Sequence, residues 1–170
     1  LKDFAYLYMG QLYIVLPYLL LTRLAFPENE EGVLQYTPVL ILSFYALIWI
    51  YDTGAYLIGI TFGKHRLIEH ISPKKTWEGF AGGIILALTG AICLYHWLPE
   101  KLSMGQWIGF ALITVFFGTW GDLVESMFKR SLQVKDSGKL MPGHGGLLDR
   151  IDSSLIAIAA VVLYFWLIIG

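Results

Sequence analysis

Five long apolar segments, separated by polar connections, constrain the fold of this 170-residue chain more than any other feature. They run approximately over residues 4–24, 37–62, 79–98, 106–124 and 153–169. Each is close to the roughly 20 residues that a helix needs to cross the hydrocarbon core of a bilayer. The period-two alternation of barrel strands is absent, so helices are the expected spanning elements. The sequence therefore predicts an all-α, polytopic integral membrane protein with about five transmembrane helices.

The composition agrees with this class of protein. Hydrophobic residues make up 56% of the chain and charged residues 15%, whereas a soluble domain carries about 25% charged residues. The net charge of -1 gives no global attraction for nucleic acid, and we expect no nucleic-acid partner. The single cysteine, Cys93, excludes an intrachain disulfide. We interpret residues 1–170 as one helical membrane unit that forms the C-terminal part of a longer protein.

Positive charge is concentrated on one side of the predicted bundle. Alternating spans place the N-terminus, the connection 63–78 and the connection before the last span on the same side, with ten of the twelve Lys and Arg residues. The positive-inside rule then places this side in the cytoplasm. Both motif-bearing connections would lie on this face, where they could form one site.

The second apolar segment contains an acid, Asp52. A carboxylate at this depth costs on the order of 2.5–3.5 kcal/mol unless it faces a wet cavity or a partner. Two interpretations remain open: a functional group, or a paired carboxyl that only locks helices together. For Gly54 and Gly59 we favour close helix packing.

The connection before the third segment reads ISPKKTWEG. Lys74 and Lys75 can meet anionic headgroups or a nucleotide phosphate, although alone they would be an ordinary juxtamembrane basic patch. Thr76 or Ser72 is expected to cap the next helix, with Glu78 in its first turn.

Two pairs of acids have i, i+3 spacing at the cytoplasmic ends of spans, namely Asp122 with Glu125 and Asp149 with Asp152. Because acids at a helix C-terminus oppose the macrodipole, the first pair is expected to have a cation partner. If the two pairs meet, their oxygen atoms suit Mg²⁺.

A basic, glycine-rich run over residues 126–153, SMFKRSLQVKDSGKLMPGHGGLLDRIDS, joins the last two spans. Backbone N–H groups around its glycines can form a nest for an anion. His144 is a weak metal candidate, because one histidine between glycines is more often a turn residue or a hydrogen-bond donor. Cations in this run can hold phosphate: Lys129, Arg130, Lys135, Lys139 and Arg150.

This run resembles the signature of the CDP-diacylglycerol synthases, also called phosphatidate cytidylyltransferases. The upstream segments 52–56, 72–79 and 121–126 also look like segments of that family, so the matches extend over residues 52–153. Members of the family have additional N-terminal spans, in line with the expectation that this chain is a C-terminal part.

The resemblance implies that CTP and phosphatidic acid react to give CDP-diacylglycerol and pyrophosphate, at the cytoplasmic face of the bacterial inner membrane. It also implies Mg²⁺ as a cofactor, K⁺ as a candidate second ion, membrane lipids as partners and a homodimer as a candidate assembly. The phosphatidate phosphate would attack the α-phosphorus of CTP. It is already largely ionised near pH 7, so a strong general base is not required.

The site that follows from the residues and the resemblance has three groups. The catalytic candidates are Asp122, Lys129, Arg130, Asp149 and Asp152. The metal-ligand candidates are Asp122, Glu125 and Asp149. The substrate-binding candidates are Asp52, Ser72, Lys74, Lys75, Lys135, Asp136, His144, Gly145, Gly146 and Arg150.

The nearest alternative is a CTP-dependent kinase of polyprenols or phytol, in which an alcohol attacks the γ-phosphorus and needs a base. The pattern of the CDP-alcohol phosphotransferases is missing. A transporter built around Asp52, Asp122 and Glu125 would leave the basic loop unexplained. A purely structural membrane module would leave the clustered carboxylates unexplained.

Overall fold

The computed structural model describes residues 2–27, 35–134, 137–138, 146 and 148–169, and contains five helical stretches that are long and apolar enough to cross a membrane. The first stretch consists of α1 (Lys2–Gly10), a π-helical turn η1 (Gln11–Val15) and α2 (Leu16–Ala25). The others are α3 (Val39–Phe62), α4 (Trp77–Trp97), α5 (Met104–Ser131) and α6 (Leu148–Ile169). The chain is therefore an all-α, polytopic integral membrane protein, as predicted.

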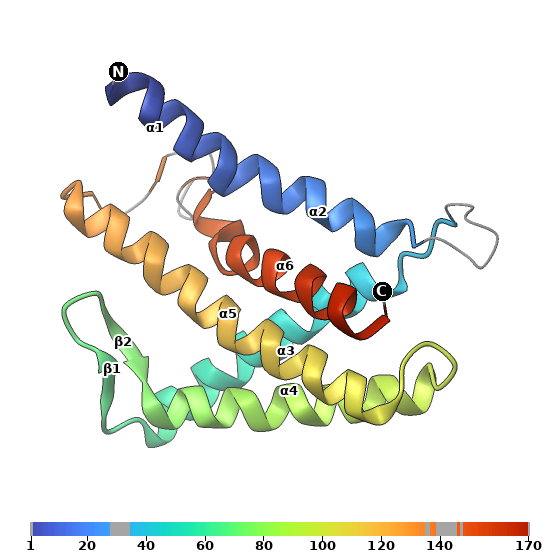
Figure 1. Ribbon diagram of the computed structural model, residues 1–170. Coiled ribbons are helices and arrows are strands. Elements are labelled where there is room, and N and C mark those ends of the chain that lie inside the picture. The colour runs from blue at the N-terminus through green and yellow to red at the C-terminus, as the bar shows by residue number, and fades with distance from the viewer. Residues whose placement is uncertain (1, 28–34, 135–136, 139–145, 147, 170) are drawn as a thin grey trace.

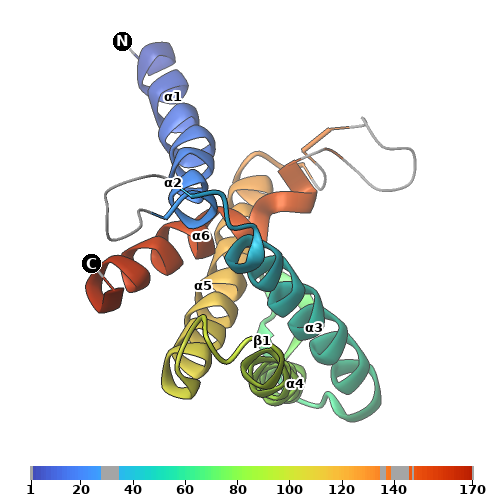
Figure 2. The ribbon, with the colours of Figure 1, turned by 90° about the vertical axis from the view of Figure 1, so that its right-hand side faces the viewer.

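Successive helices run in opposite directions, which places the predicted motifs at one end of the bundle (Figure 1). The start of α1, the connection between α3 and α4, the end of α5 and the start of α6 all lie at this end, which we call the motif end. The C-terminus and the connection between α4 and α5 lie at the opposite end. Figure 2 shows α5 between the α3–α4 pair and α6, with α1 and α2 on the outside.

Small residues allow α3 and α4 to pack backbone against backbone. A Cβ added at Gly54 of α3 would lie 3.3 Å from the Cα of Gly83 on α4. A Cβ added at Gly83 would lie 2.9 Å from the carbonyl oxygen of Tyr51. The helix-packing interpretation of Gly54 is therefore confirmed.

Away from the motif end, a cluster of buried hydrophobic side chains packs α3, α5 and α6 together. Its fully buried side chains include Phe44, Trp107, Phe110 and Ile158. Because lipid is as apolar as these side chains, close packing rather than exclusion from water holds such helices together.

The connection between α3 and α4 contains a short antiparallel hairpin that the sequence did not predict. Its strands are β1 (Arg66–Ile68) and β2 (Ser72–Thr76). The Thr76 hydroxyl accepts a hydrogen bond of 3.1 Å from the Gly79 N–H, which confirms Thr76 as the cap of α4. In the first turn of α4, Glu78 accepts hydrogen bonds from the backbone N–H groups of Lys64 and His65, and so ties the hairpin to this helix.

The last two helices extend further toward the motif end than predicted. α5 continues to Ser131 rather than ending near residue 124, and α6 begins at Leu148 rather than near residue 153. Hydropathy ends a segment at the first charges, but here the charged side chains pair with one another, so the helices continue. The prediction that Asp122 and Glu125 lie at a helix C-terminus is wrong, and the macrodipole does not explain their cation partners.

Candidate active site

α5 and α6 approach closely where their acidic residues lie. A Cβ added at Gly121 would be 2.8 Å from the carbonyl oxygen of Asp152 and 3.2 Å from that of Ser153. The absence of a side chain at this position lets the two backbones meet. The acids of α5, Asp122 and Glu125, therefore lie near those of α6, Asp149 and Asp152, although 24 to 30 positions separate them along the chain.

Lys129 joins the two helices. Its ammonium nitrogen lies 2.8 Å from Oδ1 of Asp149 on α6 and 3.4 Å from Oε1 of Glu125, one turn earlier on α5. The Asp149 carboxylate also accepts hydrogen bonds of 2.7 Å from the Gly146 N–H and 2.9 Å from the Ser137 N–H. Gly146 was predicted to bind substrate, and its N–H group contacts a carboxylate in this structure.

A second ion pair brings the hairpin to α5. The ammonium group of Lys75 on β2 contacts Oδ2 of Asp122, and the Ser126 hydroxyl donates a hydrogen bond of 3.2 Å to Oδ1 of the same carboxylate. Two motifs that are far apart in the sequence thus meet at one place, whereas the sequence predicted only that they share one side of the membrane.

Glu125 is the most deeply buried acid among the described residues of this cluster, with 2% of its surface exposed. Neither of its carboxylate oxygens accepts a hydrogen bond from a described residue, although Lys129 lies close to one of them. Asp152 interacts electrostatically with both Glu125 and Asp122. A buried carboxylate that keeps free lone pairs beside further acids offers the oxygen atoms that Mg²⁺ prefers, so the residue types here are compatible with that ion.

The predicted ligand set is not assembled as three converging groups within the described part of the chain. Asp122 and Asp149 each contact a lysine, and only Glu125 retains oxygen atoms without a hydrogen bond. Metal binding by these residues stays a prediction.

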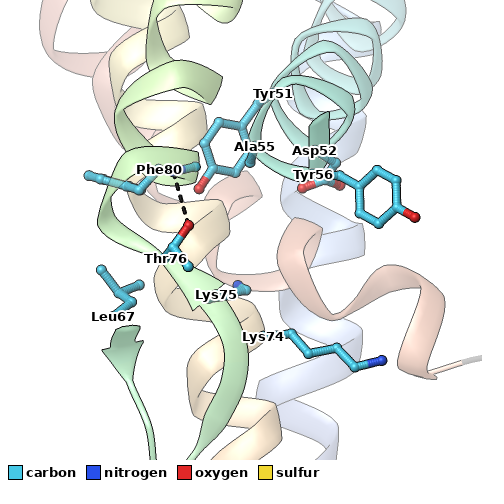
Figure 3. A pocket seen from close by; sticks show the side chains of 10 residues that line it. Tyr51, Asp52, Ala55, Tyr56, Leu67, Lys74, Lys75, Thr76 and Phe80 are labelled. Atoms are coloured by element: carbon cyan, nitrogen blue, oxygen red, sulfur yellow. Dashed lines mark hydrogen bonds between the residues drawn. The ribbon is translucent and has the colours of Figure 1, made fainter. Parts of the chain in front are cut away.

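Beside the ion pairs, a cavity of about 190 Å³ opens between α3, the hairpin and the start of α4 (Figure 3). Tyr51 and Phe80 form aromatic walls, while Asp52, Lys74 and Lys75 supply charge. Asp52 interacts with Lys75, which connects this cavity to the Asp122 ion pair. The cavity combines aromatic surface with cationic side chains, which suits a ligand that has both a ring and phosphate groups.

The remaining predicted residues are distributed as follows. Ser72 begins β2, and Arg130 and Arg150 are exposed on α5 and α6 at the motif end. Outside the described residues lie Lys135, Asp136, Lys139, His144 and Gly145. The first span adds Tyr13, which the sequence does not single out and whose ring packs edge-on against Phe128 of α5 with the ring centroids 6.2 Å apart. Tyr13 lies in a single π-helical turn, and such a turn has no recognisable signature in the sequence.

The fold and the site define an integral membrane protein with a network of paired carboxylates and lysines at one end of its helices. The chain belongs to the cytidylyltransferase family, whose model matches residues 2–168. It is 44% identical over 133 residues to a phosphatidate cytidylyltransferase of Staphylococcus aureus (strain COL), which covers 78% of this chain and 50% of the relative. It is 46% identical over 118 residues to the phosphatidate cytidylyltransferase of Staphylococcus haemolyticus (strain JCSC1435), which covers 69% of this chain and 45% of the relative. The chain thus spans about half the length of the curated relatives that it matches.

Proposed function

We propose that this chain carries the catalytic site of a phosphatidate cytidylyltransferase, which converts CTP and phosphatidate into CDP-diacylglycerol and pyrophosphate. The observation that carries the proposal is the ion-pair network of Lys75 with Asp122 and of Lys129 with Glu125 and Asp149. It joins three separate segments of a chain whose relatives bear this name.

The proposed reaction is a displacement at the α-phosphorus of CTP. An oxygen of the lipid phosphate forms a bond to the α-phosphorus, and the bond from the α-phosphorus to the bridging oxygen of the β-phosphate breaks. The electron pair of that bond leaves with pyrophosphate. Because the lipid phosphate is already largely ionised near pH 7, alignment and charge neutralisation, rather than proton abstraction, provide the catalysis.

In this proposal the lysines exchange partners when substrate binds. Lys75 and Lys129 contact carboxylates within the protein, and the same ammonium groups would donate to phosphate oxygens of CTP or of the lipid. Glu125 and Asp122 would hold Mg²⁺, with Asp152 in place of the predicted ligand Asp149, which is paired with Lys129. The ion would neutralise charge on the triphosphate and assist the departure of pyrophosphate. Arg130 and Arg150 would complete the phosphate contacts.

The cavity beside α3 would receive part of the nucleotide. Its lysines, Lys74 and Lys75, would hold phosphate, and the rings of Tyr51 and Phe80 would contact the base or ribose. The acyl chains of the lipid would remain in the bilayer. Since ten of the twelve cationic residues lie on the predicted inner side of the membrane, we propose that the motif end faces the cytoplasm.

The test is the fate of two labels of CTP. The purified chain in detergent micelles with phosphatidate and Mg²⁺ is expected to transfer the α-phosphorus label to the lipid product and the γ-phosphorus label to pyrophosphate. A γ-label in the lipid would instead indicate a kinase, and no transfer of either label would refute the proposal for this chain.

Variants connect the reaction to the site. Asp122→Asn and Asp149→Asn are each expected to lower turnover by at least about 100-fold, because each removes a charge that fixes a lysine or a cation. Glu100→Gln, at the opposite end of the helices, is the matched control and is expected to retain normal turnover. Equal activity in all three variants, with unchanged helicity by circular dichroism, would place the chemistry elsewhere.

A further inference from the structure

The first span contains a local irregularity at the level of the charged site. The Leu16 N–H donates to the carbonyl oxygen of Gln11, five residues earlier, so the helix makes one π-helical turn between α1 and α2. Such a turn accommodates one additional residue and shifts the side chains on either side of it by about 100° relative to a continuous α-helix. Turns of this kind are frequent at functional sites.

The π-helical turn carries Tyr13, whose hydroxyl oxygen is buried and has no hydrogen-bond partner among the described residues. By contrast, Tyr8 in the preceding α1 is 62% exposed. The Tyr13 ring packs against Phe128, which directly precedes Lys129 on α5. The aromatic contact therefore fixes the phenol beside the network that the proposed function uses.

Charged groups from two helices surround this hydroxyl. It interacts electrostatically with Glu125 and Asp152, with Lys129, and more weakly with Asp122. Lys129 cannot accept a hydrogen bond, and neither oxygen of Glu125 is paired with the phenol. Within the part of the chain that the structure describes, Tyr13 is thus a neutral donor beside the charged cluster with no acceptor for its hydroxyl.

We propose that Tyr13 is a substrate-contacting residue, whose hydroxyl donates a hydrogen bond to a phosphate oxygen in the occupied site. The inference rests on the proposed function and extends it to the first span, outside the residues 52–153 that carry the motifs. The neighbouring carboxylates would repel a bare phosphate, so the phosphate must arrive together with a divalent cation. A phenol adds a donor without adding charge to that arrangement.

Equilibrium binding to the full chain in phosphatidylcholine nanodiscs with Mg²⁺ tests this assignment. One arm uses CTP without phosphatidate, and the other uses dioctanoyl-phosphatidate without CTP. Tyr13→Phe is expected to bind one of the two probes about tenfold more weakly than wild type, as for the loss of one hydrogen bond to a charged acceptor. Loss in the CTP arm would assign the bond to the triphosphate, and loss in the other arm would assign it to the lipid phosphate.

Tyr8→Phe is the matched control, since it removes the same atom from an exposed position five residues earlier in the same span, and it is expected to bind both probes as wild type does. Because the Tyr13 hydroxyl has no hydrogen-bond partner among residues 2–27, 35–134, 137–138, 146 and 148–169, Tyr13→Phe is also expected to melt at the wild-type temperature. Wild-type affinity for both probes in Tyr13→Phe would overturn the assignment, as would a lowered melting temperature with unchanged binding. If the wild-type chain binds neither probe, the proposed function and this assignment are both refuted. If the wild type binds and Tyr13→Phe binds with the same affinity, only the role of Tyr13 is refuted.

Discussion

Replacing Gly121 by alanine tests whether the close approach of α5 and α6 positions the site. The new Cβ would lie 2.8 Å from the backbone carbonyl oxygen of Asp152, whereas an ordinary C···O contact is about 3.4 Å. A backbone oxygen cannot rotate away as a side chain can, so α6 must move by about 0.6 Å. This displacement would carry Asp149 and Asp152 away from Lys129 and Glu125.

The expected consequence is a larger effect on turnover than on folding. A misplacement of 1 Å can cost about 100-fold in rate, so a movement of about 0.6 Å is expected to lower kcat about tenfold or more. Overpacking of this kind destabilises by about 1–3 kcal/mol. The assay is the release of pyrophosphate by the chain in phosphatidate-containing micelles, with thermal unfolding followed by circular dichroism.

Gly118→Ala is the matched control, one turn earlier on the same face of α5. Its Cβ would lie 3.5 Å from the carbonyl oxygen of Ser153, an ordinary contact, so near-normal turnover and stability are expected. Equal losses in Gly121→Ala and Gly118→Ala would refute the argument, because the effect would then not depend on the approach at Asp152.

Two further predictions concern the polar contacts of the site. Lys129→Met would remove the cation between Glu125 and Asp149 and leave a buried carboxylate without compensation. The free energy of unfolding, measured in urea, is therefore expected to fall by about 3 kcal/mol. Wild-type stability would mean that Lys129 does not compensate these acids. Tyr51→Phe would remove the hydrogen bond of 2.6 Å between the Tyr51 and Thr119 hydroxyls, which joins α3 to α5. The free energy of unfolding, measured by thermal unfolding, is expected to fall by about 1 kcal/mol. An increase in stability would contradict this role of the bond.

Much of the architecture could be predicted because hydropathy reports directly on membrane helices. The five spans follow from local composition, and spacing limited the cap of α4 to Thr76 or Ser72, of which the structure shows Thr76. The hairpin over residues 66–76 could not be predicted in this way. Its strands are short, its turn lacks a strong glycine signal, and its position depends on contacts of Glu78 with the backbone of residues 64–65.

The site was predictable in its residue types but not in its pairing. Charge alternation along the chain placed Lys75 and Asp122 on the same side of the membrane, but only the fold shows that they contact each other. The limits of α5 and α6 were misjudged because a charged side chain ends a hydropathy segment even when a partner on the next helix compensates it. The position of the Tyr13 side chain beside these charges could not be predicted, because its direction depends on one π-helical turn.

The central claim is that the carboxylates and lysines at the motif end form a single site for a metal-bound nucleotide. An experimental structure of the full chain with CTP and Mn²⁺, in which the anomalous signal locates the ion, tests it most directly. The account predicts the ion between α5 and α6 in contact with Glu125, and the triphosphate beside Lys75 and Lys129. An ion and a nucleotide bound at the opposite end of the helices, in the groove that Arg23 lines between α2 and α6, would contradict it.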